Sequence, residues 1–137
     1  MICPYLMFNG DCEDALAHYA KVLGAKIDMM MRNSEAPPDM PCPPERKDKI
    51  MHVRFSIGSD VLMASDSPPE HYVGKPHGIS VSLQMVDVAE AERKFAALTE
   101  GGSVMMPFGP TFWSKGFGMG TDRFGIPWMI NVPAEGF

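Results

Sequence analysis

The side chains that could carry out chemistry are few in this sequence, and they are scattered along it. Its four histidines are His18, His52, His71 and His77. Its three cysteines are Cys3, Cys12 and Cys42, an odd number at no spacing typical of a metal site. No serine, histidine and acid stand in an arrangement recognisable as a nucleophilic triad. The catalytic residues, if there are any, stay unknown from these patterns.

His52 is the most informative histidine because it shares a predicted strand face with Arg54. A structural hydrogen bond and a role at a binding site or subunit interface both fit that position, and the sequence leaves both open. His18 falls on the polar side of a predicted helix, and His71 and His77 flank a proline-rich linker. Solvent exposure is expected for these three.

Two further groups could act chemically. Asp66 could pair with a neighbouring strand or cap the turn before Pro68, and we favour the cap. Cys12 stands at the start of a predicted helix, where the helix dipole can lower a thiol pKa. Its counterpart in the second half of the chain is Val88, so we interpret Cys12 as a small apolar residue.

A glycine-rich stretch at residues 116–120 is reminiscent of a loop that binds a nucleotide or S-adenosylmethionine. Such a loop needs a buried parallel strand before it and the start of a helix after it. Here residues 121–125 lead into a predicted strand. We therefore reject this motif and expect no cofactor.

Composition narrows the functional class. The chain has 137 residues, 45% of them apolar, with 12 Lys+Arg against 17 Asp+Glu. That length suits one compact domain or two small modules. The acidic balance argues against nucleic acid or an anionic membrane as a partner. We expect no signal peptide and no transmembrane segment, and the odd number of cysteines favours the reducing cytoplasm.

The first half of the chain predicts a strand, a helix and three more strands. A short apolar run at 3–9 precedes Asp11, which we expect to cap a helix that ends at Gly24. Strands are predicted at 26–32, 50–57 and 61–66. Between the first two of these, five prolines predict an irregular loop; they are Pro37, Pro38, Pro41, Pro43 and Pro44.

The second half repeats this plan at an offset of 76 residues. Strands are predicted at 78–85, 103–108, 112–120 and 126–132, and Asp87 is expected to cap a helix that ends at residues 101–102. The repeat predicts an α+β fold of two tandem β-α-β-β-β modules, 1–67 and 77–137, joined by a linker at 68–76. Curved antiparallel sheets in both modules would together form a cup for a ligand.

Three segments resemble one known superfamily: residues 4–26, 51–66 and 112–132, the last with its Asp-x-Phe-Gly-x-x-Trp element. The chain is similar to the vicinal oxygen chelate superfamily of glyoxalase I, bleomycin and fosfomycin resistance proteins and extradiol dioxygenases. Within it, the PhnB-like branch is the most similar, and a histidine at the place of His52 is common there. The resemblance implies the glyoxalase/bleomycin resistance-type fold.

Metal-dependent members of this superfamily place His or Glu ligands on the first and last strands of each module. The corresponding positions here are Pro4, Met63, Ser80 and Met129. None of them is a plausible ligand for a hard divalent ion. We therefore expect no metal of the superfamily type.

The resemblance then suggests which residues would contact a ligand. The cup floor is expected to carry alternate residues of the inner strands: Leu6, Phe8, Met63, Ser65, Ser80, Ser82, Met129 and Asn131. His52 joins this set. Trp113 and Phe117 could form a lid or belong to the core, and Lys115 could meet an anionic substrate or be solvated. Thirteen methionines would make the cup apolar and pliable.

These residues favour a metal-independent protein that binds an unidentified small molecule, because the cup has no obvious general base or Lewis acid. The alternative is a metal-dependent lyase, isomerase or transferase of the glyoxalase or fosfomycin-resistance type. A third hypothesis is an enzyme that uses His52 or Asp66 in an unrecognised way. The superfamily resemblance also implies a homodimer.

Overall fold

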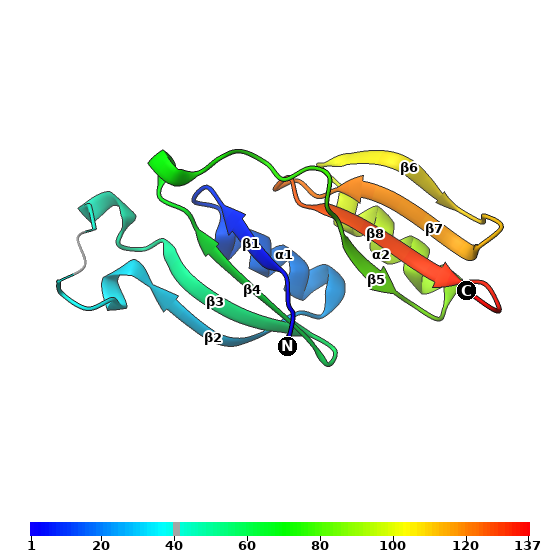
Figure 1. The fold of residues 1–137 in the computed structure, drawn as a ribbon, viewed down its shortest axis with the longest axis horizontal. Coiled ribbons are helices and arrows are strands. Elements are labelled where there is room, and N and C mark those ends of the chain that lie inside the picture. The colour runs from blue at the N-terminus through cyan, green and yellow to red at the C-terminus, as the bar shows by residue number, and fades with distance from the viewer. Residues whose placement is uncertain (40–41) are drawn as a thin grey trace. The chain divides into compact units, whose positions relative to one another are not determined.

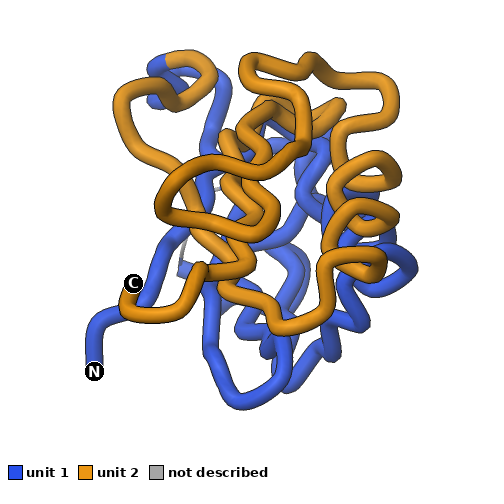
Figure 2. Tube along the Cα trace, turned by 90° about the vertical axis from the view of Figure 1, so that its right-hand side faces the viewer, with its two compact units in different colours: residues 1–73 blue, residues 74–137 orange. Residues whose placement is uncertain are grey.

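The computed structural model describes residues 1–39 and 42–137. The chain divides into two compact units, Met1–Val73 and Gly74–Phe137, shown in blue and orange in Figure 2. The division falls inside the segment that the sequence predicts as the linker. Pro41, one of the five prolines of the predicted irregular loop, lies outside the described residues.

The described part of the first unit contains one α-helix and a four-stranded sheet, which can be followed in Figure 1. Its main elements are β1 (Tyr5–Phe8), α1 (Cys12–Leu23), β2 (Lys26–Arg32), β3 (Ile50–Ile57) and β4 (Asp60–Asp66). Short 3₁₀ helices are η1 (Asn33–Glu35), η2 (Pro44–Arg46) and η3 (Pro69–His71). The strand order is β1-β4-β3-β2. β1 is parallel to β4, and the other neighbouring strands are antiparallel.

The second unit repeats this arrangement. Its elements are β5 (Val81–Gln84), α2 (Val88–Thr99), β6 (Ser103–Gly109), β7 (Ser114–Thr121) and β8 (Pro127–Pro133), in the sheet order β5-β8-β7-β6. β5 is parallel to β8, and the other pairs are antiparallel. The offset of 76 residues recurs in the elements themselves, because β5 begins at 81 against 5 for β1 and α2 at 88 against 12 for α1.

The predicted α+β fold of two β-α-β-β-β modules is confirmed, with one correction. The sheets are mixed, whereas we expected antiparallel ones. The cause is the helical connection, which starts the second strand of each module in the direction of the first. The chain reverses between the second and third strands and again between the third and fourth, so the last strand has the direction of the first. It therefore lies parallel to the first strand when the two become neighbours.

The two helices begin in different ways. The Asp87 carboxylate accepts a hydrogen bond from the Glu90 backbone N–H at 3.1 Å, so this predicted cap is confirmed. Asp11 occupies the predicted N-cap position of α1, but the capping bond expected from its carboxylate is wrong, because the side chain makes no capping hydrogen bond. The Asp66 carboxylate instead accepts hydrogen bonds from the backbone N–H groups of Cys12, the first residue of α1, and of Gly10 just before it. At the other end, Gly24 adopts φ 71°, the left-handed conformation that ends many helices.

Each helix packs on one face of its own sheet. In the first unit Tyr19 of α1 stacks on Phe55 of β3, with ring centroids 6.3 Å apart, and both side chains are fully buried. In the second unit the α2 residues Ala91, Phe95 and Leu98 are buried, together with alternate residues of β8, which are Trp128, Ile130 and Val132. Within residues 1–39 and 42–137 each unit has a single α-helix, so the opposite face of each sheet has no α-helix of its own unit.

The Asp-x-Phe-Gly-x-x-Trp element has a structural explanation. One oxygen of the buried Asp122 carboxylate accepts hydrogen bonds from the backbone N–H groups of Phe124 and Ile126, at 2.9 and 3.0 Å. The other oxygen accepts one from the Trp128 indole N–H at 2.9 Å. A single carboxylate thus fixes the turn before β8 and anchors the largest core side chain of the second unit.

The glycines of β7 are explained by close packing. A Cβ atom on Gly118 would lie 2.9 Å from the Phe95 ring of α2, and one on Gly120 would lie 2.6 Å from the Ser103 carbonyl oxygen. These glycines therefore let the helix and the β6 edge approach the β7 backbone. A helix does not follow them, which agrees with our rejection of a nucleotide-binding loop. No helix among the described residues is long and apolar enough to cross a membrane.

Candidate functional site on the helix-free face of the second unit

The side of the second sheet opposite α2 gathers most of the predicted ligand contacts of that unit. We call it the helix-free face of the second unit. Along β7 and β8, buried residues that face the helix alternate with half-buried or exposed residues that face away from it. The residues of this face are Ser82, Gln84, Lys115, Phe117, Met119, Met129 and Asn131.

Three polar side chains form a ladder across β5 and β8 on this face. The Asn131 side-chain N–H donates to the Gln84 side-chain oxygen at 2.9 Å. The Gln84 amide N–H in turn donates to the Ser82 hydroxyl at 2.9 Å. The strand register makes this possible, because Gln84 pairs with Asn131 and Ser82 lies on the same side one pleat away. Both amide groups are thereby oriented.

The oxygen of the Asn131 side chain lies at the end of the ladder and has no hydrogen-bond partner among the described residues, although the atom is buried. Buried polar atoms nearly always have a partner. Leaving an acceptor unpaired costs on the order of 1–3 kcal/mol. A ligand would remove this cost by displacing the side chains that cover the oxygen and donating a hydrogen bond to it. Asn131 is therefore the residue of this face that most directly indicates a binding site.

Aromatic and methionine side chains surround this acceptor. Phe117 pairs with Asn131 across β7 and β8, and Met119 pairs with Met129. Trp113, immediately before β7, meets Phe117 edge to face with ring centroids 5.6 Å apart. Such a surface favours planar apolar groups. The lid of Trp113 and Phe117 over a bound ligand stays a prediction.

Two further predicted contacts lie near this surface. Lys115 is exposed on the same side of β7 as Phe117. Ser80 is half-buried and directly precedes β5. Because Lys115 is exposed, its positive charge lies at the edge of the face, where it suits an anionic group of a ligand.

The first unit also has a helix-free face, which carries the other predicted contacts. The Tyr5 hydroxyl and His52 Nδ1 are hydrogen-bonded at 3.0 Å, and their rings stack with centroids 5.7 Å apart. Met63 pairs with Tyr5 on one side and with Arg54 on the other. The structure thus shows the structural hydrogen bond that the sequence left open for His52. Ser65 lies one pleat from Met63 on the same side, opposite Met7 of β1.

Leu6 and Phe8 correct the predicted cup floor. Both side chains are buried, Leu6 at 8% and Phe8 at 1% exposure, and they belong to the core of the first unit. The register pairs Leu6 with Ala64, not with Met63, so Leu6 and Phe8 lie on the face opposite Met63 and Ser65. All four residues of β1 are apolar or aromatic, and alternation could therefore not identify the helix side. Tyr5 and Met7 occupy the helix-free face instead.

The residues at the superfamily's metal positions do not fit a divalent cation. Met63 and Met129 offer only thioether sulfur, and Pro4 offers a carbonyl oxygen that already accepts a hydrogen bond from the Met63 backbone N–H at 3.0 Å. Ser80 offers one neutral hydroxyl. Hard divalent ions require several carboxylate, imidazole or carbonyl donors. Within residues 1–39 and 42–137, no three His, Cys, Asp or Glu side chains are grouped as a metal site requires.

Asp66 is a structural carboxylate and not the predicted cap of the turn before Pro68. One of its oxygens accepts hydrogen bonds from the backbone N–H groups of Gly10 and Cys12, at 2.9 and 3.0 Å. The other accepts one from the Ile50 backbone N–H at 2.9 Å. The carboxylate is thus engaged by three backbone donors. The contact with Ile50 of β3 is the contact with a neighbouring strand that the sequence also allowed, whereas the bonds from Gly10 and Cys12 at the start of α1 were not predicted.

Cys12 lies directly against this carboxylate. Its side chain is fully buried, and burial raises the pKa of the Cys12 thiol, with the charge of Asp66 raising it further. The thiol therefore stays protonated at neutral pH and is a poor nucleophile. Of the remaining histidines, His71 and His77 are exposed as predicted, whereas His18 is half-buried, and its ring centroid lies 6.1 Å from that of the adjacent Tyr19.

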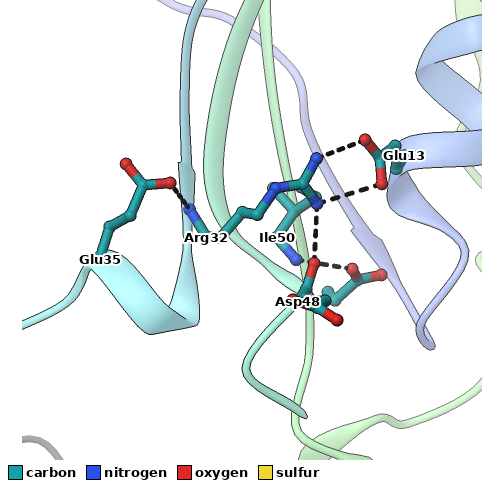
Figure 3. Close-up of polar contacts among 6 residues, drawn as sticks. Glu13, Arg32, Glu35, Asp48 and Ile50 are labelled. Atoms are coloured by element: carbon teal, nitrogen blue, oxygen red, sulfur yellow. Dashed lines mark hydrogen bonds and ion pairs between the residues drawn. The ribbon is translucent and has the colours of Figure 1, made fainter.

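Arg32 and Glu13 form an ion pair at the surface of the first unit (Figure 3). Both guanidinium nitrogens meet the Glu13 carboxylate, at 3.1 and 2.5 Å, and one also donates to the Asp48 carbonyl oxygen at 2.8 Å. The hydrogen bond from Arg32 lowers the pKa of Glu13. The pair ties α1 to the end of β2, and its side chains are partly exposed.

Four residues that we place on the candidate surfaces were not predicted as contacts from the sequence: Gln84, Met119, Tyr5 and Met7. Gln84 continues the alternation of Ser80 and Ser82, a signal that could have identified it. Tyr5 directly follows Pro4 and was not among the predicted contacts. Its contact with His52 joins residues 47 positions apart, and no local pattern reports such a pairing.

Comparison with known proteins identifies the family. A family model for the Glyoxalase/Bleomycin resistance protein/Dioxygenase superfamily matches residues 2–130. The chain belongs to this superfamily. Protein YjdN from Escherichia coli (strain K12) is 36% identical over 141 residues, which cover 96% of this chain and 94% of YjdN.

Solved structures of other proteins have the same fold. Protein PA1353 from Pseudomonas aeruginosa has a TM-score of 0.86 and 50% sequence identity, and the match covers 97% of both chains. A PhnB protein from Bacillus cereus has a TM-score of 0.78 and 24% identity, over 96% of this chain and 98% of that one. At that identity the second likeness shows the fold alone.

Proposed function

We propose that this superfamily member is a PhnB-like protein that binds a small molecule on the helix-free face of the second unit without a protein-bound metal. The observation that carries the proposal is the buried, unpartnered side-chain oxygen of Asn131. It lies beside Phe117 and two residues from Met129. One acceptor within an apolar surface is typical of small-molecule sites, where a few polar groups orient the ligand.

Binding is favoured over catalysis by the kinds of groups on this face. Its residues supply amides, a hydroxyl, one ammonium group and apolar side chains. Amides and hydroxyls orient a ligand through hydrogen bonds, but they do not act as general acids or bases at neutral pH. The residues at the family's metal positions, which include two methionines, are unsuited to a hard divalent ion. A metal-dependent lyase, isomerase or transferase is therefore the less favoured alternative.

Elemental analysis of protein purified without an affinity tag tests the metal-independent part. We expect far less than one zinc, nickel, manganese or iron per chain, and no increase of the melting temperature Tm when these cations are added. A stoichiometric metal together with a rise of several degrees would overturn the proposal, because a ligand that binds the folded state stabilises it by mass action. The metal-dependent alternative would then be favoured.

We also propose that the protein works as a cytoplasmic homodimer. All three cysteines are unpaired, which is typical of a reducing compartment. Support for the dimer comes from β6, an edge strand of the second sheet on which Val104, Met105 and Met106 are exposed at 51%, 69% and 41%. An exposed apolar edge strand favours pairing with another chain.

A further inference from the structure

We propose that the Asn131 side-chain oxygen selects the ligand, which is a neutral or anionic molecule that carries an O–H or N–H donor on a planar apolar body. This inference rests on the proposed function and names the ligand class for the same face. It follows from the direction of the hydrogen-bond ladder, from the side chains beside Asn131 at the end of the ladder, and from the charge of Lys115 at the edge of the face.

The direction of the ladder decides which atom is presented. The Asn131 amide N–H donates to Gln84, whose own amide N–H donates to Ser82, both at 2.9 Å. If Asn131 alone were turned over, its oxygen would face the Gln84 oxygen, and two acceptors would oppose each other. The carbonyl oxygen therefore stays at the buried end. Its natural complement is a donor.

The neighbouring side chains determine the shape of the ligand. Phe117 lies directly across from Asn131 in the strand register, and the Trp113 ring meets Phe117 at 69°. Met129 lies one pleat from Asn131 along β8 and pairs with Ser82 of β5. Aromatic rings and thioethers together favour a flat, polarizable group. The donor is accordingly expected on an aromatic or other planar body.

The charge of the face narrows the class further. Lys115 is exposed two residues before Phe117 on the same side of β7. No carboxylate belongs to the residues of this face. An ammonium group on the ligand would meet repulsion without compensation. We therefore infer a neutral donor such as a phenol, an indole N–H or an amide, with any charge on the ligand negative.

Matched probes test the donor requirement. Phenol and anisole, and indole and 1-methylindole, differ by the methyl group that removes the donor. Their dissociation constants are measured by NMR titration of the whole protein, with the backbone amide signals of Phe117 and of residue 131, which every variant retains, as the local readout. We expect phenol and indole to bind about five- to tenfold more tightly than their methylated partners, the ratio for one neutral hydrogen bond.

Variants of Asn131 assign that ratio to its oxygen. Asn131→Leu removes the acceptor and should bring the ratio to about one, whereas Asn9→Leu, at an exposed asparagine of the first unit, should leave it unchanged. Asn131→Asp retains acceptor oxygens and should preserve the preference for the donor. It also serves as the test if Asn131→Leu does not fold.

The possible failures are distinguishable. Equal binding of methylated and unmethylated probes, or a preference that persists in Asn131→Leu, would overturn the role of Asn131 and leave the proposed binding function intact. Tighter binding of anisole and 1-methylindole would show that both amides are reversed, which also overturns the inference. If none of the four probes perturbs signals from this face, the proposed function fails as well.

Discussion

The buried carboxylate of Asp66 joins three backbone segments of the first unit. It accepts hydrogen bonds from Gly10, from Cys12 at the start of α1 and from Ile50 at the start of β3. Hydrogen bonds to a charged acceptor are stronger than neutral ones. Asp66 thus replaces the local cap that Asp11 does not provide. Its position at the end of β4 makes the helix start depend on the completed sheet.

Asp66→Asn should lower the free energy of unfolding by about 2–4 kcal/mol, because the new amide NH₂ would oppose a backbone donor in a buried site. Urea denaturation measures this change. Asp11→Asn is the matched control, since the Asp11 side chain makes no capping bond, and it should cost no more than about 0.5 kcal/mol. Equal losses in the two variants would contradict the assignment of the cap to Asp66.

The Glu13–Arg32 pair predicts a dependence of stability on pH. The hydrogen bond from Arg32 lowers the pKa of Glu13 in the folded state, relative to about 4.3 for an unperturbed glutamate. The pair therefore stabilises the fold fully above that unfolded value. The stabilisation is lost as the pH falls through the lowered folded pKa.

Glu13→Gln tests this dependence through the difference in Tm from the wild type across pH 2–7. The difference should be small, since surface pairs contribute little, and it should shrink toward zero at acid pH. Asp14 is an exposed acid in the same first turn of α1. For Asp14→Asn, the difference in Tm from the wild type should not shrink at acid pH in this way. A difference between Glu13→Gln and wild type that grows on acidification would be inconsistent with the pair.

At the scale of elements, the edge strand β6 is the most unusual. Its first five residues are all exposed, and its pairing with β7 is irregular between Val104 and Met106. Protein edge strands usually carry charges or prolines that block pairing. β6 has a proline at Pro107, but its Val104 to Met106 segment carries no charge. This favours contact with a second copy of the chain.

Met105→Lys should therefore shift the protein from dimer to monomer in light scattering coupled to size-exclusion chromatography. A lysine at this position would place a charge in the pairing edge, which disfavours association. Val86→Lys is the control, because Val86 is 94% exposed but lies outside the strands, and it should not alter the mass. A monomeric wild type, or an unchanged dimer in Met105→Lys, would disprove the edge contact.

For the molecule as a whole, the tandem plan could be predicted because its signals are local and repeated. The helices that end near Gly24 and Gly101, and the fixed offset between halves, are visible in the sequence. The core side of β1 could not be predicted, since Leu6 and Met7 are equally apolar. The cap from Asp66 and the ladder from Gln84 to Asn131 join residues 47 or more positions apart, and such contacts depend on sheet register.

The parallel pairing of first and last strands has a consequence for synthesis on the ribosome. β1 pairs with residues 63–66 of β4, so its edge has no partner in the nascent chain until the whole first module has emerged. Closing so long a segment is slow compared with forming a helix or a hairpin. α1 and the β3–β4 hairpin can form earlier. We therefore expect β1 to be the last strand to join the first sheet during synthesis. Until then the apolar residues 5–8 have no strand partner and are the segment that a chaperone would bind first.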